Sequence, residues 1–284
     1  MSVLFIARRP TLADSPSIRF GVIGFGNMGK AIVSGALDAQ IIGVHNVVIY
    51  DIAAAARESA VAQGLSVLSS DAEVCEHSDI ILLAVKPQQL NEALEQCGTA
   101  LEDKAVMSIV AGVDSQHIRQ LTQGNIRLLR LLPNTPALVQ EGAFVLSSDN
   151  DFTPTEYRWA ESLYDSLGLV EHLPEAQLDA VCGLSGGAPA YAAMFIEALA
   201  DGGVQQGLPR DVSLRLAAQS CLGTAKLLLN TQMHPASLKD MVSSPAGTTI
   251  EACAVLEQGA FRGTVISAVN AASERSAEIG GSHT

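Results

Sequence analysis

The stretch Phe20-Gly21-Val22-Ile23-Gly24-Phe25-Gly26-Asn27-Met28-Gly29 decides the fold of this chain. A short apolar run that favours a strand leads directly into a G-x-G-x-x-G sequence, and a helical pattern follows. In dinucleotide-binding folds the first glycine permits a tight turn, the second lets the backbone approach a pyrophosphate, and the third lets helix and strand pack closely. The N-terminus of the helix offers free N–H groups to phosphate. The alternative is a glycine-rich turn without a ligand, and the order of strand, loop and helix favours the dinucleotide site.

Outward from this loop, short β-branched runs alternate with helical patterns such as Met28–Ala39 and Gln88–Cys97. This alternation requires right-handed crossovers and therefore predicts a parallel sheet that helices cover on both faces. The predicted strands are Phe20–Ile23, Asn46–Tyr50, Asp79–Val85, Val106–Val110 and Ile126–Leu132, with Val145–Leu146 and Leu169–Leu173 as further candidates at the edge.

After about Pro174 the pattern becomes entirely helical. The predicted helices are Pro189–Gln206, Arg210–Asn230, Pro235–Val242, Thr249–Gln258 and Phe261–Ile279. The first of them is apolar on nearly all sides, and such a helix must be buried on all sides. Because a domain of ~110 residues can rarely bury it alone, we expect a helical core shared between subunits. The fold class is thus an α/β Rossmann-type dinucleotide-binding domain over 19–174 and an all-α dimerisation domain over 175–284, after a mobile arm over 1–18.

Composition excludes several classes of function. The net charge is −13 and no Lys/Arg-rich run occurs, so nucleic acid and anionic membrane surfaces are poor candidate partners. No apolar stretch approaches the ~20 residues of a membrane span. The five cysteines are scattered without C-x-x-C spacing, which predicts neither a metal site nor disulfides but reduced thiols in a cytoplasmic protein.

Asp51 ends the second predicted strand, where a carboxylate can accept hydrogen bonds from ribose hydroxyls. It would repel a 2′-phosphate and so favours NAD over NADP. Against this preference, Arg57 lies nearby in the sequence and could cover a phosphate. The alternative role for Asp51 is to cap the helix predicted over 53–64.

The carboxyl ends of three further strands should meet at the same edge of the sheet, where ligands of open parallel sheets bind. They carry Val85-Lys86-Pro87-Gln88, Ala111-Gly112-Val113 and Arg130–Pro136. Lys86 offers a cation there, or is a solvated or ion-paired lysine. Asn134 and Thr135 could bind a carboxamide, or could form an Asx-type turn before Pro136.

The segment Ser243–Glu251 predicts an anion site in the helical half. Thr248 and Glu251 have the capping-box spacing, so a helix should begin here with Thr248 as its N-cap. Gly247 exposes the backbone, and the free N–H groups of the helix start can bind a small carboxylate without an arginine. The hydroxyls of Ser244 and Thr249 can orient an iminium N–H, which suffices when hydride transfer is the difficult step.

Together these motifs resemble the pyrroline-5-carboxylate reductase family from about Arg19 to Ile279. The resemblance is carried by the loop Gly24–Gly29, Ala84-Val85-Lys86-Pro87, Pro133-Asn134-Thr135-Pro136-Ala137, Pro189-Ala190-Tyr191 and the segment from His234-Pro235 through Leu238-Lys239-Asp240 to Ile250. It implies hydride transfer from NADH or NADPH to the cyclic imine 1-pyrroline-5-carboxylate, which gives L-proline, in a dimer or a ring of dimers.

The resemblance also assigns residues. It implies that Thr249 and Lys86 are catalytic and that Ser244, Gly247, Thr248 and Thr249 bind the substrate. With the motifs above, it predicts a cofactor site made of Gly24, Phe25, Gly26, Asn27, Met28, Gly29, Asp51, Asp71 (near the adenosine ribose), Ala84, Val85, Lys86, Pro87, Ala111, Gly112 and Asn134.

The chain departs from the family pattern at Leu132 (usually Met), Gly187 (commonly Ser), Gln232 (often an acid) and Ala246 (usually Gly). Ala246 matters most, because its Cβ restricts the backbone beside the predicted carboxylate site. Two alternatives stay open. A β-hydroxyacid dehydrogenase-like reductase would need a helical lysine in the second half, where only Lys226 and Lys239 occur. A catalytically silent dinucleotide-binding regulator would bind cofactor without turnover.

Overall fold

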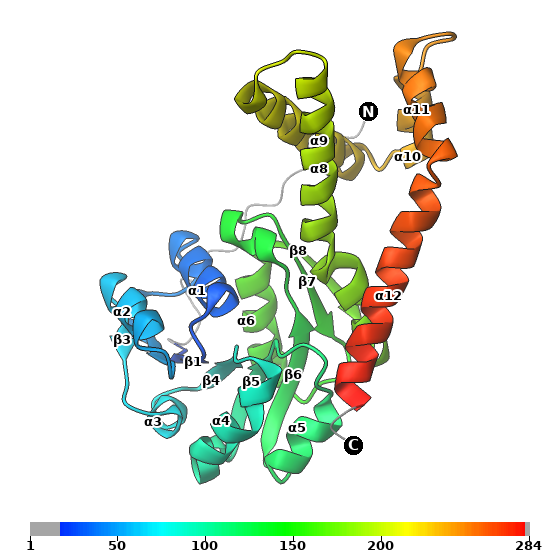
Figure 1. Ribbon diagram of the computed structural model, residues 1–284. Helices are drawn as coiled ribbons and strands as arrows, with labels where there is room; N and C mark the ends of the chain where they lie inside the picture. The colour runs from blue at the N-terminus through cyan, green and yellow to red at the C-terminus, as the bar shows by residue number, and fades with distance from the viewer. Residues whose placement is uncertain (1–17, 282–284) are drawn as a thin grey trace. The chain divides into compact units, whose positions relative to one another are not determined.

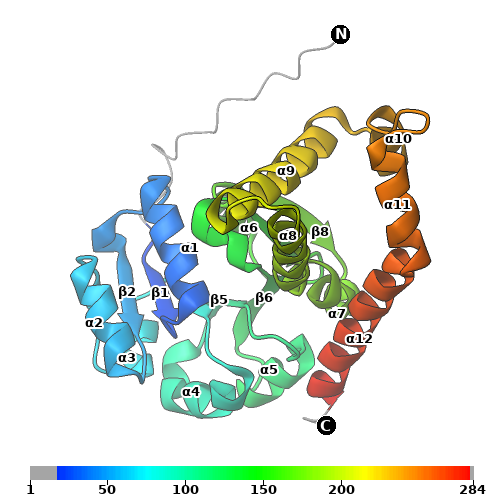
Figure 2. The same cartoon turned by 45° about the horizontal axis from the view of Figure 1, so that its top comes forward.

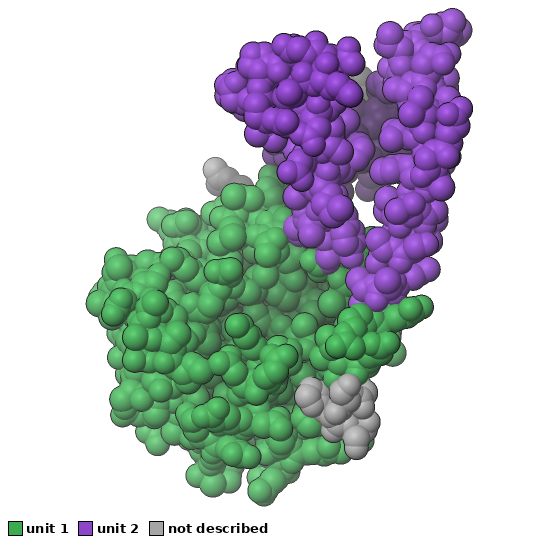
Figure 3. Space-filling model, in the orientation of Figure 1, with its two compact units in different colours: residues 1–186, 273–284 green, residues 187–272 purple. Residues whose placement is uncertain are grey.

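A computed structural model describes residues 18–281 of the chain (Figure 1). The described residues form two compact units, coloured separately in Figure 3. Unit 1 contains residues 18–186 together with 273–281, and unit 2 contains residues 187–272. The arm predicted over 1–18 lies, up to residue 17, outside the described residues.

Unit 1 is built on an eight-stranded sheet of order β3-β2-β1-β4-β5-β6-β7-β8. All neighbouring strands are parallel except β6 and β7, which pair antiparallel through Leu131–Leu146 and Leu132–Val145. The sheet is thus mostly parallel, and β3 is an addition too short to show a sequence pattern. The strands are β1 (Phe20–Ile23), β2 (Val47–Tyr50), β3 (Ser66–Val67), β4 (Ile80–Leu83), β5 (Lys104–Ser108), β6 (Ile126–Leu132), β7 (Gly142–Ser147) and β8 (Gly168–Leu173).

Helices cover both faces of this sheet, which explains why its central strands are apolar without alternation. In β4, Ile80 and Leu82 face one hydrophobic core while Ile81 and Leu83 face the other, and all four are buried. One core receives α1 (Asn27–Asp38) and α6 (Pro154–Asp165), and the other receives α3 (Asp71–Glu76), α4 (Leu90–Cys97) and α5 (Ser115–Leu121). Unit 1 also contains α2 (Ala54–Ala62) and α7 (Leu178–Val181).

Unit 2 is entirely helical (Figures 1 and 2). Its helices are α8 (Ala188–Gln205), α9 (Arg210–Thr231), α10 (Pro235–Met241), α11 (Thr248–Gln258) and α12 (Phe261–Gly281), the last of which continues into unit 1 from residue 273. The helix starts and ends agree with the predicted ones to within one or two residues. Prolines and glycines near the helix ends make these boundaries visible in the sequence.

Few side chains of unit 2 are buried within one copy of the chain. Helices α8 to α11 bury only Ala200, Ser213, Ala217 and Leu238 among their described residues. Large apolar side chains are instead more than half exposed: Met194, Leu216, Leu229, Val255 and Ile266. A helical unit with so little core of its own needs further apolar contacts.

Two searches of the described residues complete the description of the fold. No helix among them is both long and apolar enough to cross a membrane. Within the same part of the chain, no group of three or more His, Cys, Asp and Glu side chains could hold a metal ion. The cysteines are all free.

Candidate functional site

The protein itself requires glycine at two of the three glycine positions in the loop after β1, but not at the remaining one. Gly24 has a φ of +94°, and a Cβ there would lie 2.7 Å from the carbonyl oxygen of Ala84. A Cβ on Gly29 would lie 2.4 Å from the carbonyl oxygen of Gly24. At Gly26, by contrast, a Cβ would meet no protein atom within 4 Å. The protein itself therefore does not require the second glycine, whereas a ligand that approaches the backbone would.

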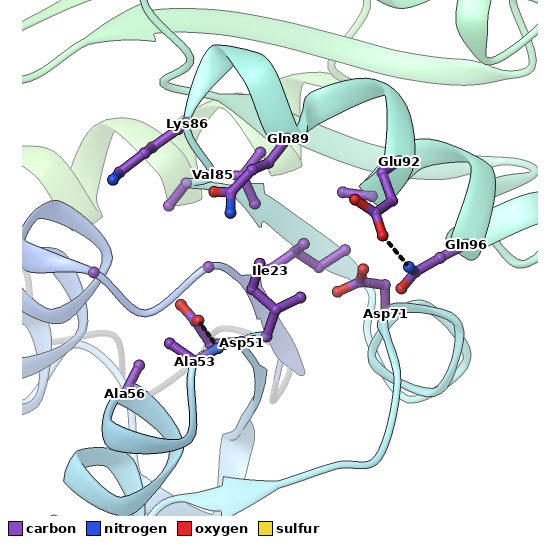
Figure 4. Close-up of a pocket in the computed structure, with 15 residues that line it drawn as sticks. Ile23, Asp51, Ala53, Ala56, Asp71, Val85, Lys86, Gln89, Glu92 and Gln96 are labelled. Atoms are coloured by element: carbon purple, nitrogen blue, oxygen red, sulfur yellow. Dashed lines mark hydrogen bonds between the residues drawn. The ribbon is translucent and has the colours of Figure 1, made fainter.

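The space beside Gly26 belongs to a cavity of about 280 Å³ within unit 1 (Figure 4). Helix α1 begins at Asn27 without a side-chain cap, so its first N–H groups are available to an anion. Predicted residues that line the cavity are Gly24, Gly26, Asp51, Asp71, Ala84, Val85 and Lys86, and the remaining lining residues are Ile23, Ile52, Ala53, Ala56, Gln89, Glu92, Ala93 and Gln96.

Asp51 braces the glycine loop against the end of β2. One carboxylate oxygen accepts the backbone N–H of Phe25 at 2.6 Å, and the other accepts that of Ala53 at 2.7 Å. Helix α2 begins after Ala53, which is its N-cap and receives no side-chain bond. The prediction that Asp51 is the N-cap is therefore wrong, because the N-cap is Ala53 and, at this helix, the Asp51 carboxylate bonds only to the N–H of that residue, not to those of the first helical turn. Its role toward a ribose stays a prediction.

Arg57 is folded back over the same turn. Its Nη1 donates to the carbonyl oxygens of Asp51 at 2.6 Å and Ile52 at 2.9 Å, and the guanidinium lies 6.0 Å from the centre of the Tyr50 ring. Arg57 thus bends back over this turn, but it does not line the cavity, and its Nη1 already donates to the backbone.

Sequence reasoning missed the polar side chains of α4 that line the cavity, Gln89 just before it and Glu92 and Gln96 within it. They fit an amphipathic helix pattern, and nothing in that pattern tells which polar residues face a cavity. Gln96 donates to Glu92 at 3.3 Å. Glu92 adds a carboxylate to the part of the cavity that holds Asp71 (Figure 4).

Asp71 is the first residue of α3, and only 3% of it is exposed. Among the residues that the structure describes, none donates a hydrogen bond to its carboxylate. Burial, together with the smaller effect of the nearby charges of Asp51 and Glu92, raises the pKa of Asp71 to about 6. A carboxylate in such a place is costly to ionise.

We expect Asp71→Asn to stabilise the protein at about pH 8 but not at about pH 4. Because the folded state has the higher pKa, about 6 against an ordinary 3.8, stability is lost as the pH rises through this window and stays lower above it. The substitution should recover up to roughly 3 kcal/mol, which corresponds to a melting temperature roughly 5 °C higher or more. Thermal melts of both proteins at the two pH values measure this, and an equal difference at both would contradict it.

The remaining predicted cofactor residues do not line the cavity. Lys86, which does line it, is exposed and makes no described ion pair. Gly112 has a φ of +69° and packs against Ile279 in the last turn of α12. Phe25, Asn27, Met28 and Gly29 form the loop and helix start, and Pro87 and Ala111 follow β4 and β5. Their contacts with a cofactor stay predictions.

The Asn134 side chain is occupied by backbone partners that are distant in the sequence. Its Nδ2 donates to the carbonyl oxygen of Ser185 at 3.1 Å, and its Oδ1 accepts the N–H of Ala143 at 2.8 Å. These bonds replace the local Asx-type turn considered above. If Asn134 also bound a carboxamide, it would do so with a side chain that already links β7 to the 182–186 segment.

The anion site predicted in the helical half falls at the start of α11 in unit 2. This helix begins at Thr248, and its N-cap is Gly247 with extended backbone (φ −82°, ψ 167°) and no side-chain bond. The prediction that Thr248 is the N-cap is therefore wrong, because the helix starts one residue earlier than the capping-box spacing implies. Thr249 is half-buried, and its hydroxyl makes no hydrogen bond among the described residues.

The turn before α11 is tight. A Cβ on Gly247 would lie 2.3 Å from Oγ of Ser244, and the Gly247 N–H donates to the Ser244 carbonyl oxygen at 3.0 Å. Ala246 has a φ of +54°, a left-handed conformation that favours glycine. The departure at Ala246 thus falls where the backbone is strained, by roughly 1 kcal/mol, and the turn is nevertheless formed.

Comparison with known families divides the chain in a similar way. Residues 19–112 match the family model described as NADP oxidoreductase, coenzyme F420-dependent. Residues 175–279 match the model described as pyrroline-5-carboxylate reductase dimerisation.

Curated relatives and solved structures match nearly the whole chain. The pyrroline-5-carboxylate reductase of Methanosarcina acetivorans is 39% identical over 264 residues, which cover 92% of this chain and 98% of the relative. That of Glycine max is 39% identical over 267 residues, covering 93% and 96%. The crystal structure of Plasmodium falciparum pyrroline carboxylate reductase with NADP bound matches with a TM-score of 0.85 at 31% identity, covering 94% of this chain and 99% of that one.

Proposed function

Because the chain belongs to the pyrroline-5-carboxylate reductase family, we propose that the cavity of unit 1 holds the dinucleotide and that the α11 N-terminus of unit 2 holds the substrate. The activity is that of an NAD(P)H-dependent oxidoreductase that reduces 1-pyrroline-5-carboxylate to L-proline, the last step of proline biosynthesis. The site assignment rests on one observation made at two places. A Cβ on Gly26 would meet no protein atom within 4 Å, and the Thr249 hydroxyl has no hydrogen-bond partner among the described residues.

The cavity suits a dinucleotide in two respects. Gly26 leaves room for the pyrophosphate, and the uncapped start of α1 supplies N–H groups to its charge. Lys86 is the one cation among the described lining residues. When bound, the reduced nicotinamide supplies the hydride, and the residues of the chain have to position the imine and stabilise its charges.

The start of α11 suits a small imino acid. The backbone N–H groups of its first turn have no intrahelical partner and can neutralise the substrate carboxylate on a chain of net charge −13. The Thr249 hydroxyl would accept the hydrogen bond of the iminium N–H, and the Ser244 hydroxyl is the second candidate for this role. Because the positive iminium carbon is the better hydride acceptor, holding this proton in place favours the reaction.

The proposal is tested by following oxidation of NADH and NADPH in parallel with purified protein. We expect oxidation only when 1-pyrroline-5-carboxylate is present, with a preference for NADH because of Asp51. Binding of either dinucleotide without turnover in folded protein would support the silent-regulator alternative and overturn the enzymatic one.

We further propose that unit 2 forms a dimer, and in larger assemblies a ring of dimers, through the apolar side chains exposed on α8, α9, α11 and α12. The match of residues 175–279 to a dimerisation model supports this. Sedimentation at micromolar concentration should therefore show no monomer. A stable monomer that retains activity would contradict the proposal.

The functional division we propose is a dinucleotide domain over 19–174 and a helical substrate and dimerisation domain over 175–284. The family matches over 19–112 and 175–279 support this division. We also propose a cytoplasmic location, which suits five free cysteines, and partners limited to small molecules and further copies of the chain.

A further inference from the structure

The charged side chains of the cavity are not balanced. Asp51, Asp71 and Glu92 line it together with a single cation, Lys86. Figure 4 shows Asp71, Glu92 and Gln96 together at one end of the cavity and Lys86 at the other. A ligand that carries phosphate must therefore place its less charged part near the acidic end.

Asp71 differs from the other two carboxylates in having no donor. Asp51 accepts two backbone N–H groups, and Glu92 accepts the amide of Gln96. The residue Asp71 is only 3% exposed, lines the cavity and receives no hydrogen bond on its carboxyl from any described residue. A buried carboxyl without a partner costs free energy that a ligand hydroxyl would recover.

The fold indicates which part of the ligand lies there. With the pyrophosphate at the Gly24–Gly29 loop, the ribose of the adenosine falls at the end of β2, beside Asp51. Asp51 and Asp71 line the same cavity, and the charge of Asp51 acts on Asp71. A free 2′-hydroxyl can donate to ionised Asp71, whereas a 2′-phosphate would place negative charge against a carboxylate pair.

We propose that the protonation state of Asp71 sets the choice between the two nicotinamide dinucleotides: the carboxylate favours NAD(H), and the neutral acid admits the 2′-phosphate of NADP(H). This inference rests on the proposed function, because it assumes that the cavity binds these cofactors. It makes cofactor preference depend on pH near neutrality, where an asparagine or serine at this position would not.

The groups that face Asp71 are few. Strand β1 contributes apolar Ile23 to the cavity wall, and Asp51 follows β2. Helix α4 contributes Glu92 and the thiol of Cys97, whose pKa is raised by a hydrogen bond with Cys75 and by burial, so that it stays protonated. The turn Gly98–Leu101, which also packs on α3, carries no titratable side chain. Beside these neighbours, the pKa of Asp71 is raised to about 6, close to the physiological range.

The test is calorimetric binding of NAD⁺ and NADP⁺ between about pH 5.5 and about pH 8, since the oxidised forms survive acid. In the unmodified protein the ratio of the NADP⁺ to the NAD⁺ dissociation constant should rise about tenfold over this range, within the limit of about tenfold per pH unit for one linked proton. Asp71→Asn should flatten the rise to about twofold and lower the ratio at high pH. The second variant, Asp71→Ser, should do the same.

Glu76→Gln is the matched control, because it removes one negative charge from an exposed position of the same helix. In Glu76→Gln the ratio of the two dissociation constants should rise with pH as steeply as in the unmodified protein. Titration of the 2′-phosphate itself contributes equally in all the variants and so cannot explain a difference between them. An unchanged slope in both Asp71 variants, or equal flattening in Glu76→Gln, would overturn the inference while leaving the reductase function intact. If the unmodified protein binds neither dinucleotide, the proposed cavity assignment fails instead.

Discussion

Thr249→Val is expected to lower kcat/KM for 1-pyrroline-5-carboxylate by roughly ten- to a thousand-fold, about 1.4–4 kcal/mol of transition-state stabilisation. Valine keeps the shape of the side chain and removes only the hydroxyl proposed to hold the iminium N–H. Thr249 is half-buried and bonds to no described residue, so the fold should tolerate the change. Cofactor affinity should barely change, because the residues that line the cavity proposed for the dinucleotide all belong to unit 1.

Thr248→Val is the control for stability alone. The sequence predicts that this variant loses a helix cap, but the N-cap is Gly247 and Thr248 is exposed without a cap bond. Its melting temperature should therefore stay nearly unchanged. If Thr249→Val instead kept full kcat/KM and melted several degrees lower, Thr249 would be structural and the substrate site would be misassigned.

Gly26→Ala is expected to raise the dissociation constant of either dinucleotide by roughly ten- to a hundred-fold, about 1.4–2.8 kcal/mol. The added methyl group meets no protein atom within 4 Å, and Gly26 has a negative φ (−72°) that alanine adopts freely. It would occupy the space through which a pyrophosphate approaches the backbone. Titration with NAD⁺ and NADP⁺, together with a thermal melt, measures both effects.

Gly24→Ala makes the matching comparison within the same loop. Here the φ of +94° and the 2.7 Å approach to the Ala84 carbonyl oxygen oppose any side chain, so stability should fall by roughly 1–3 kcal/mol. Affinity lost in Gly26→Ala without loss of stability, and stability lost in Gly24→Ala, separate the two roles. Unaltered affinity in folded Gly26→Ala would place the pyrophosphate elsewhere.

The elements that could be predicted from the sequence are those whose causes are local. The strand Phe20–Ile23, the glycine loop and the helix after it follow from apolar runs and from the steric demands of Gly24 and Gly29. The helices of unit 2 were placed to within two residues, because prolines and glycines at their ends act over a single turn. The antiparallel pairing of β7 could not be predicted, since strand direction depends on which edge of the sheet is free.

The roles of individual side chains also depend on residues that are distant in the sequence. From the sequence alone, Asp51 is a ribose ligand or a cap, Asn134 a carboxamide ligand or a turn residue, and Thr248 a cap. The tertiary structure gives Asp51 the N–H of Phe25, 26 positions away, and gives Asn134 the carbonyl oxygen of Ser185, 51 positions away. It also brings Asp71 and Glu92 into one cavity.

The sequence by itself determined the fold class, the glycine loop and, to within one residue, the start of the helix that carries Thr249, because periodicity and glycine sterics act between near neighbours. The family followed from the resemblance of its motifs. Only the tertiary structure decided which carboxylates of the cavity are satisfied and that Asp71 is buried without a donor. Burial and hydrogen-bond partners, and hence the raised pKa of Asp71, depend on residues that meet only when strands and helices distant in the sequence pack together.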